Sequence, residues 1–182
     1  MKKILLILTF SLSFVGAAQA QDSLQVQPQQ VSAPYKLAVG MRYATGPAGL
    51  ALGITAKYFI REQAALEAYS DLNPEARQFL SSISYVWQPK LTTSSRLRPY
   101  AGVGIGLLHT KNPAPMYFDG PSSYTNPVGV FSFGAEYAFK KLPLAISLDY
   151  RSTFLRYGRS TPAYVNHYRA SNLGIGLKYT FR

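Results

Sequence analysis

The chain has 182 residues and a formal net charge of +11, with 19 Lys and Arg against eight Asp and Glu. It contains no cysteine, which excludes a disulfide framework and a lipid-modified cysteine behind a signal sequence. A basic balance is typical of proteins that bind nucleic acid or an anionic membrane surface. Because the chain also carries an export signal, we expect a membrane as its partner and no nucleic acid.

The first 20 residues have the features of a signal peptide. Lys2 and Lys3 precede an apolar run over residues 4–15, and residues 18–20 (Ala-Gln-Ala) have the small-x-small pattern of a cleavage site. The apolar run is too short for a retained membrane helix. Residues 21–34, which are rich in Gln and carry two prolines, predict a flexible periplasmic segment. We therefore expect export, with the folded domain over residues 35–182.

Eight segments in this domain alternate between apolar and small or polar side chains, which is the period of a β-strand. The last segment is the clearest, because apolar residues at 173, 175, 177, 179 and 181 alternate with Asn, Gly, Gly, Lys and Thr. A strand of about ten residues with one apolar face is what a transmembrane β-barrel requires. The predicted strands are Tyr35–Tyr43, Gly49–Phe59, Ala64–Ser70, Phe79–Gln88, Arg98–Thr110, Val128–Lys140, Leu144–Phe154 and Asn172–Arg182.

The sequence thus predicts an all-β fold, an eight-stranded antiparallel up-and-down transmembrane β-barrel with both termini in the periplasm. The alternative is a soluble sandwich or lipocalin-like barrel, whose outer face carries dense charge. Here the face opposite the apolar one is rich in Gly and Ser, and aromatic residues gather at strand ends, as they do in membrane-interface girdles. The predicted girdle residues are Tyr43, Tyr58, Phe59, Trp87, Tyr100, Phe139, Tyr150, Phe154, Tyr179 and Phe181.

The connections between the predicted strands differ at the two ends of the barrel. The expected periplasmic connections are residues 60–63, 89–97 and 141–143. The expected outer connections are residues 44–48, 71–78, 111–127 and 155–171. Three of the four outer connections are long, which is the asymmetry typical of outer-membrane barrels.

The chain resembles the small outer-membrane β-barrel family, the OmpX-like and OmpA-barrel-like porin-family proteins, in two strands: Arg98-Pro-Tyr-Ala-Gly-Val-Gly-Ile-Gly106 and Gly174-Ile-Gly-Leu-Lys-Tyr-Thr-Phe181. The resemblance covers residues 35–182 and implies a place in the outer membrane of a Gram-negative-type bacterium. In that family a C-terminal aromatic residue is the signal for the barrel-insertion machinery. The resemblance therefore implies that Tyr179 and Phe181 are the insertion signal, although Arg182 follows them and departs from the family pattern.

The predicted inner face carries charges, and an eight-stranded barrel is just wide enough for side chains to fill it. A buried charge is costly unless it is paired, so we expect an internal salt-bridge network rather than an open pore. An alternative assigns Glu136 and Asp149 to catalysis as acids. The predicted network consists of Arg42, Lys57, Glu67, Glu136, Asp149, Arg151 and Lys178.

Enzymatic and channel functions are the alternatives to a structural barrel. Some eight-stranded barrels resemble lipid A acyltransferases or deacylases, which use a His with a Ser and a carboxylate near the outer face. His109, His167 and Ser171 are the available residues, but the His–Ser spacing does not fit that pattern and residues 155–171 hold no acid. A narrow channel for small solutes needs a continuous wet path, which inward Arg and Lys side chains oppose. We assign no catalytic residue, no metal site and no cofactor.

The two longest outer connections combine basic and aromatic residues, which predicts contact with the phosphates of lipopolysaccharide. An extracellular protein or glycan is the alternative partner, and we expect a monomer. We therefore predict a non-enzymatic outer-membrane barrel with a plugged polar interior and an envelope-structural or surface-interaction role. The contact candidates are Arg156, Tyr157, Arg159, Tyr164, His167, Tyr168 and Arg169.

Overall fold

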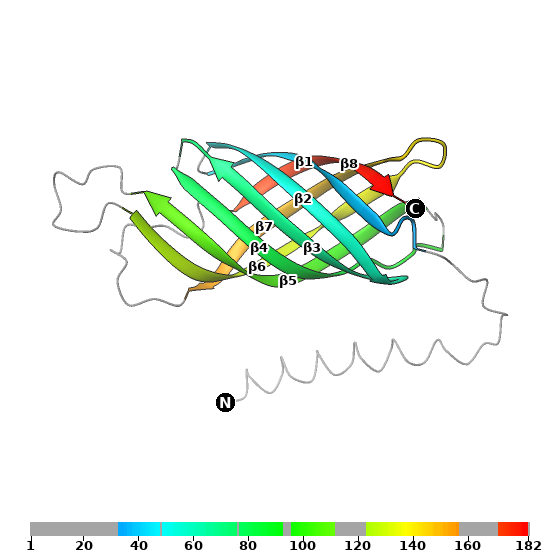
Figure 1. Cartoon of the computed structure of the whole chain (residues 1–182), viewed down its shortest axis with the longest axis horizontal. Helices are drawn as coiled ribbons and strands as arrows, with labels where there is room; N and C mark the ends of the chain where they lie inside the picture. The colour runs from blue at the N-terminus through cyan, green and yellow to red at the C-terminus, as the bar shows by residue number, and fades with distance from the viewer. Residues whose placement is uncertain are drawn as a thin grey trace, which may run out of the picture. The chain divides into compact units, whose positions relative to one another are not determined.

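The computed structural model describes residues 33–47, 49–75, 77–92, 96–111, 123–156 and 171–181. The regular elements in these ranges are eight β-strands (Figure 1). Across these same ranges, no helix has the length and apolar character needed to span a membrane. The strands are β1 (Leu37–Gly46), β2 (Gly49–Arg61), β3 (Ala64–Asn73), β4 (Gln78–Trp87), β5 (Leu97–Lys111), β6 (Ser123–Ala138), β7 (Leu144–Arg156) and β8 (Asn172–Phe181).

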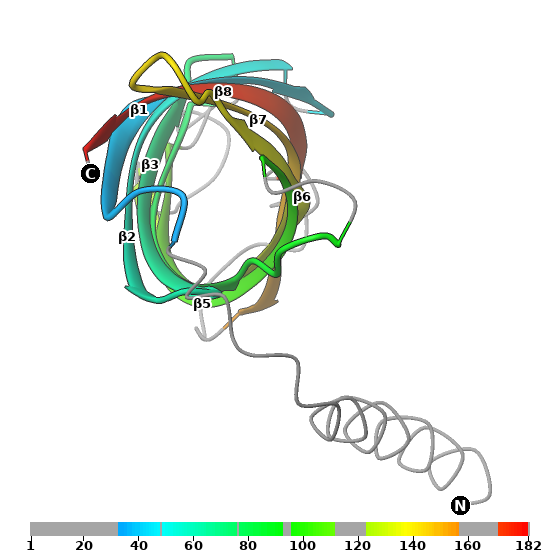
Figure 2. The same ribbon diagram turned by 90° about the vertical axis from the view of Figure 1, so that its right-hand side faces the viewer.

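The eight strands close into one barrel. Each strand pairs antiparallel with its neighbours in the sequence, and the last strand returns to pair with the first (Figures 1 and 2). The seam between β1 and β8 is continuous, from Leu37 opposite Phe181 to Thr45 opposite Leu173. Closure removes the unpaired strand edges that lipid cannot hydrogen-bond. The predicted eight-stranded, antiparallel, up-and-down barrel is confirmed.

Large apolar side chains cover the outside of the barrel. Ile105 exposes 77% of its surface, and Met41 and Ile54 each expose 64%. The alternate positions point inward, and most of the buried side chains there are polar or charged. A water-soluble barrel has the opposite distribution, with its apolar residues inside. The wall is therefore built for contact with lipid on its outer face.

The outer connections are shorter than predicted, because the strands are longer. β3 continues to Asn73 and β4 begins at Gln78, so that Asp71 and Asn73 still alternate inward as part of a strand. The prediction of a long loop over residues 71–78 is wrong. β6 likewise begins at Ser123, five residues before its predicted start.

Two aromatic residues of the predicted girdle lie inside the barrel instead. Phe59 and Tyr100 expose only 6% and 3% of their surfaces. Their position follows from strand alternation, since their neighbours Tyr58 and Ala101 point outward. Proximity to a strand end was an insufficient criterion, because the parity of a residue decides its side of the wall.

The lipid-facing wall yields a prediction for two positions on one strand. Ile105→Arg places a charge at the middle of β5, whereas Leu97→Arg places it at the first residue of the same strand. In phospholipid vesicles we expect Ile105→Arg to lower the free energy of unfolding by about 2–4 kcal/mol and Leu97→Arg by about 0–1 kcal/mol. Urea unfolding followed by tryptophan fluorescence measures both. Equal and small losses would indicate that water, not lipid, contacts this wall.

Candidate functional site

The seven charged residues of the predicted network all point into the barrel. They come from six strands, and each exposes 2% or less of its surface. The structure joins them into one unbranched series in which cations and anions alternate. We call this series the charge chain; its order is Arg42, Asp149, Arg151, Glu67, Lys178, Glu136 and Lys57.

The first half of the charge chain connects β1, β7 and β3. The Arg42 guanidinium lies 2.7 Å from Oδ1 of Asp149. Arg151 then bridges two carboxylates, with its Nε 3.1 Å from Asp149 Oδ1 and its terminal nitrogen 3.1 Å from Glu67 Oε2. The planar fork of an arginine suits this bridging position, because its donors point in fixed directions.

The second half connects β3, β8, β6 and β2 through lysines. Lys178 Nζ lies 3.3 Å from Glu67 Oε1 and 2.8 Å from Glu136 Oε2. Lys57 Nζ ends the series 3.1 Å from the same Glu136 oxygen. Four cations therefore pair with three anions, and each carboxylate contacts two cations. Pairing of this kind offsets the large cost of removing the charges from water.

Neutral side chains satisfy the remaining donors and acceptors of the charge chain. Tyr100 donates to Asp149 Oδ2 at 2.8 Å, and Tyr35 donates to Glu136 Oε1 at 2.5 Å. Thr55 donates to Glu67 at 2.8 Å. Gln88 donates to Glu136 at 3.1 Å and accepts from Lys57 at 3.2 Å. These contacts come from β2, β5 and the segments beside β1 and β4, so the polar interior links the whole circumference.

One tyrosine stacks beneath both arginines of the charge chain. The ring of Tyr69 lies 4.1 Å from the Arg151 guanidinium carbon and 5.5 Å from that of Arg42. Its hydroxyl accepts from Arg42 at 3.1 Å and donates to Asp71 at 3.0 Å. The face of a tyrosine ring attracts cations, and the attraction is stronger where the cation is buried away from water. Tyr69 thus binds two positive charges and an additional buried carboxylate at once.

Sequence reasoning missed two buried charges, Asp71 and Arg98, which expose 6% and 3% of their surfaces. The sequence pattern predicts a loop at Asp71, whereas the residue continues the inward alternation of Glu67 and Tyr69 in β3. Arg98 has the same parity as the inward Tyr100 and donates to the backbone oxygen of Glu62 at 3.2 Å. Extending the strand parity by one step in each strand identifies both residues.

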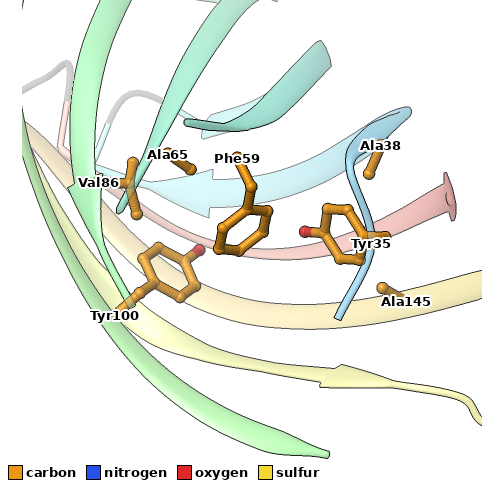
Figure 3. Close-up of a cluster of buried hydrophobic side chains, with 7 residues drawn as sticks. All are labelled: Tyr35, Ala38, Phe59, Ala65, Val86, Tyr100 and Ala145. Atoms are coloured by element: carbon orange, nitrogen blue, oxygen red, sulfur yellow. The ribbon is translucent and has the colours of Figure 1, made fainter. Parts of the chain in front are cut away.

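Apolar clusters lie on both sides of the charge chain inside the barrel. Towards the end where β1 begins, Tyr35 and Phe59 pack edge to face at 5.1 Å (Figure 3). They form a cluster with Ala38, Ala65, Val86, Tyr100 and Ala145. Towards the other end, a second cluster consists of Leu80, Leu108, Val128 and Val130.

A small cavity remains beside the second apolar cluster, lined in part by Asp71, Asn73 and Gln78. Its volume is about 10 Å³, which is room for a single water molecule at most. A concavity of about 1190 Å³ also exists, but its lining includes the outward-facing Ile83 and Ile105. Most of its lining side chains lie on the lipid-facing side of the wall, although the buried Thr55, Tyr69, Ser82 and Val128 also border it.

A glycine provides the space for the first cation of the charge chain. A Cβ atom at Gly174 would lie 2.5 Å from the guanidinium carbon of Arg42. Gly174 is the residue opposite both Ala44 and Asp149 in the neighbouring strands. This inward glycine therefore leaves room for the long side chain of Arg42.

The candidate enzymatic residues do not meet on one face of the wall. His109 continues the outward parity of Leu107 and lies 2.9 Å from the Thr125 hydroxyl. Ser171 is buried inside, where its hydroxyl lies 2.5 Å from that of Ser152. His167 lies outside the described residues. Within the described ranges, no group of three or more His, Asp or Glu side chains is placed to hold a metal ion.

The remaining sequence candidates lie at the ends of the barrel. Tyr179 and Phe181 point outward from β8 and pack against each other at 4.9 Å between ring centroids. Their role as an insertion signal stays a prediction. Of the outer contact candidates, Arg156 is the last residue of β7. The others, Tyr157, Arg159, Tyr164, His167, Tyr168 and Arg169, lie outside the described residues.

The charge chain yields a prediction that depends on its alternation. Glu136→Gln keeps the shape of the side chain but leaves four cations against two anions, and Lys57 loses its ion pair. We expect the free energy of unfolding in vesicles to fall by about 3–5 kcal/mol, because a buried charge is left uncompensated. Urea titration measures this loss.

Lys57→Met is the matched control, since it removes the other member of the same ion pair. It leaves three cations against three anions, so we expect a clearly smaller loss of stability. Losses of equal size in the two variants would contradict the importance of charge balance. No loss in Glu136→Gln would contradict the network itself.

Comparison with known proteins gives a likeness of fold. No family model matches the chain, and no curated protein matches it in sequence. The crystal structure of the N-terminal β-barrel domain of Pseudomonas aeruginosa OprF matches with a TM-score of 0.61 and 16% identity, over 80% of this chain and 96% of that one. Neisserial surface protein A matches with a TM-score of 0.52 and 16% identity, over 82% of this chain and 98% of that one.

A structure from the de novo design of transmembrane β-barrels matches similarly, with a TM-score of 0.53 and 15% identity, over 80% of this chain and 95% of that one. Natural and designed barrels of unrelated sequence therefore share this architecture. The fold implied by the strand motifs of the chain is confirmed, and it is that of the small transmembrane β-barrels.

Proposed function

We propose that the protein is a closed, non-enzymatic β-barrel of the outer membrane with an envelope-structural or surface-interaction role. The observation that carries this proposal is the filled interior. The charge chain crosses the barrel from wall to wall, and an apolar cluster lies on either side of it. A solute would have to break buried ion pairs to pass, so the interior supports a scaffold and not a channel.

The chemistry of the interior also favours a structural role over catalysis. Glu136 and Asp149 each contact two cations and a tyrosine hydroxyl, and both expose only 1% of their surfaces. A general acid needs access to its substrate. Every contact of these two carboxylates is instead with buried side chains of the barrel interior. The outward His109 and the inward Ser171 supply no alternative active site.

The ends of the barrel are the surfaces that remain for interaction. β5 and β7 end, and β6 and β8 begin, at the end of the barrel opposite the start of β1, so residues 112–122 and 157–170 connect strands at that end. In the proposed orientation this is the cell surface. Basic and aromatic residues there suit the phosphates of lipopolysaccharide, with an extracellular protein or glycan as the other partner class. One fold neighbour is itself named a surface protein.

The closed interior predicts the absence of ion conduction. In planar phospholipid bilayers we expect no conductance steps from the purified, refolded protein, under conditions in which a general porin gives them. Stepwise conductance would contradict the closed barrel. A lipid A mass spectrum that changes by one acyl chain with the amount of protein in cells would contradict the non-enzymatic part of the proposal.

The surface role predicts that lipopolysaccharide binding depends on the outer connections. In vesicles containing lipopolysaccharide, we expect the variant with Arg156, Arg159 and Arg169 changed to Gln to bind several-fold more weakly than the native chain at low salt. The variant with the same three arginines changed to Lys is the matched control, because it keeps the positive charges and is expected to retain the binding. Salt-sensitive binding that survives the change of these arginines to Gln would contradict this assignment.

A further inference from the structure

The end of the barrel where β1 begins and β8 finishes carries an excess of surface cations. Its one exposed acid among the described residues is Glu62. At the opposite end, the charged side chains that the structure describes as exposed are Glu75, Arg77 and Lys111. We call the first set the basic collar; it consists of Lys36, Arg61, Lys90, Arg96, Lys140 and Lys141, exposed except for the half-buried Lys90.

Backbone hydrogen bonds hold the collar segments to the barrel wall. The Lys36 amide donates to the Phe181 oxygen at 2.9 Å, and the Lys36 oxygen accepts from Phe59 at 2.9 Å. The Arg96 oxygen accepts from Ala138 at 3.1 Å. Similar bonds join Gln88 to Gln63 and Thr180 to Pro143. The cations are thus presented from positions fixed by the wall.

Aromatic residues lie on the outer wall immediately beside the basic collar. Tyr58, Trp87, Tyr179 and Phe181 expose between 43% and 53% of their surfaces at the ends of their strands. Such rings sit at the level of the lipid headgroups, between hydrocarbon and water. Arg61 and Lys90 follow Tyr58 and Trp87 by three residues, and Lys36 is hydrogen-bonded to Phe181 across the seam. These cations therefore lie just beyond the level of the rings, where the lipid phosphates are.

The cations are also distributed around the circumference. Lys36 precedes β1, and Arg61 is the last residue of β2. Lys90 and Arg96 lie between β4 and β5, and Lys140 and Lys141 lie between β6 and β7, so the cations occur at all the strand connections of this end (Figure 2). A protein that docked on one side would contact only part of this ring. A leaflet of lipids surrounds the whole barrel, so the distribution fits headgroups better than it fits a single macromolecule.

We propose that the basic collar binds anionic glycerophospholipids, with its Lys and Arg side chains contacting headgroup phosphates. This inference rests on the proposed membrane barrel, in which the collar faces the periplasmic leaflet. Lys and Arg near an anionic lipid surface are attracted to it, and salt weakens the attraction. The collar enriches anionic lipid around one end of the barrel and fixes the depth of the barrel in the membrane.

The single tryptophan of the chain, Trp87, is a reporter at the collar. We would refold the protein in phosphatidylcholine vesicles and add brominated phosphatidylglycerol or brominated phosphatidylcholine at equal mole fraction, since bromine quenches nearby tryptophan. At low salt we expect the anionic lipid to associate roughly three- to fivefold more strongly than the zwitterionic lipid, and the ratio to fall towards one at high salt.

Two variants locate the effect. Changing Lys36, Arg61, Lys90 and Lys141 to Gln is expected to abolish the preference for phosphatidylglycerol. Changing Arg77 and Lys111 to Gln at the other end is the control and is expected to retain the preference. Preference that survives the collar substitutions would overturn the collar as the binding site.

The native chain alone distinguishes failure of this inference from failure of the membrane barrel. Quenching by brominated phosphatidylcholine with equal quenching by phosphatidylglycerol would overturn the collar proposal and leave the barrel in place. Absence of quenching by either lipid would show that Trp87 does not contact the bilayer, and the proposed membrane barrel would then fail first.

Discussion

A closed wall of eight strands makes every second side chain face a narrow interior, and the rest of the structure depends on this constraint. The interior of such a barrel is only wide enough for side chains, so the inward residues must fill it and satisfy one another. The outer positions carry apolar residues that contact lipid, so the polar and charged residues of each strand occupy the inward positions. The charge chain is the solution that this protein shows.

Alternation of charge makes that solution stable. Each of the three carboxylates contacts two cations, and the two inner cations, Arg151 and Lys178, each contact two carboxylates. The cations at the ends of the series, Arg42 and Lys57, contact one carboxylate each. Tyrosine rings and hydroxyls provide the remaining contacts of the charged groups, and the ring of Tyr69 contacts both Arg42 and Arg151. Removing water from charges is costly, and the cost is offset only where every charge has partners of good geometry. The same pairing that stabilises the interior also closes it.

With a filled interior, the two ends of the barrel are the surfaces left for interaction, and they differ in their connections and in their charged residues. One end has exposed aromatic residues on the outer wall and the basic collar, whose segments are bound to the wall by backbone hydrogen bonds. The other end has the two long connections of the chain, after β5 and β7. The two ends suit the proposed division between an anchor in one leaflet and an interaction surface beyond the other.

The sequence by itself determined the strands, their number and the side of the wall that most residues face, because the period of two is a local property of each strand. It therefore predicted the seven members of the charge chain. The sequence did not determine which charged residues form ion pairs with one another. Arg42 and Asp149 are 107 residues apart, and they meet only because the barrel closes in this register. The inward positions of Phe59, Tyr100 and Asp71 follow from the same local alternation, whereas the packing of Phe59 and Tyr100 with Tyr35 and Ala145 depends on closure. Local alternation decides which face of the wall a side chain lies on, whereas the curvature and register of the whole barrel decide which side chains meet across the interior.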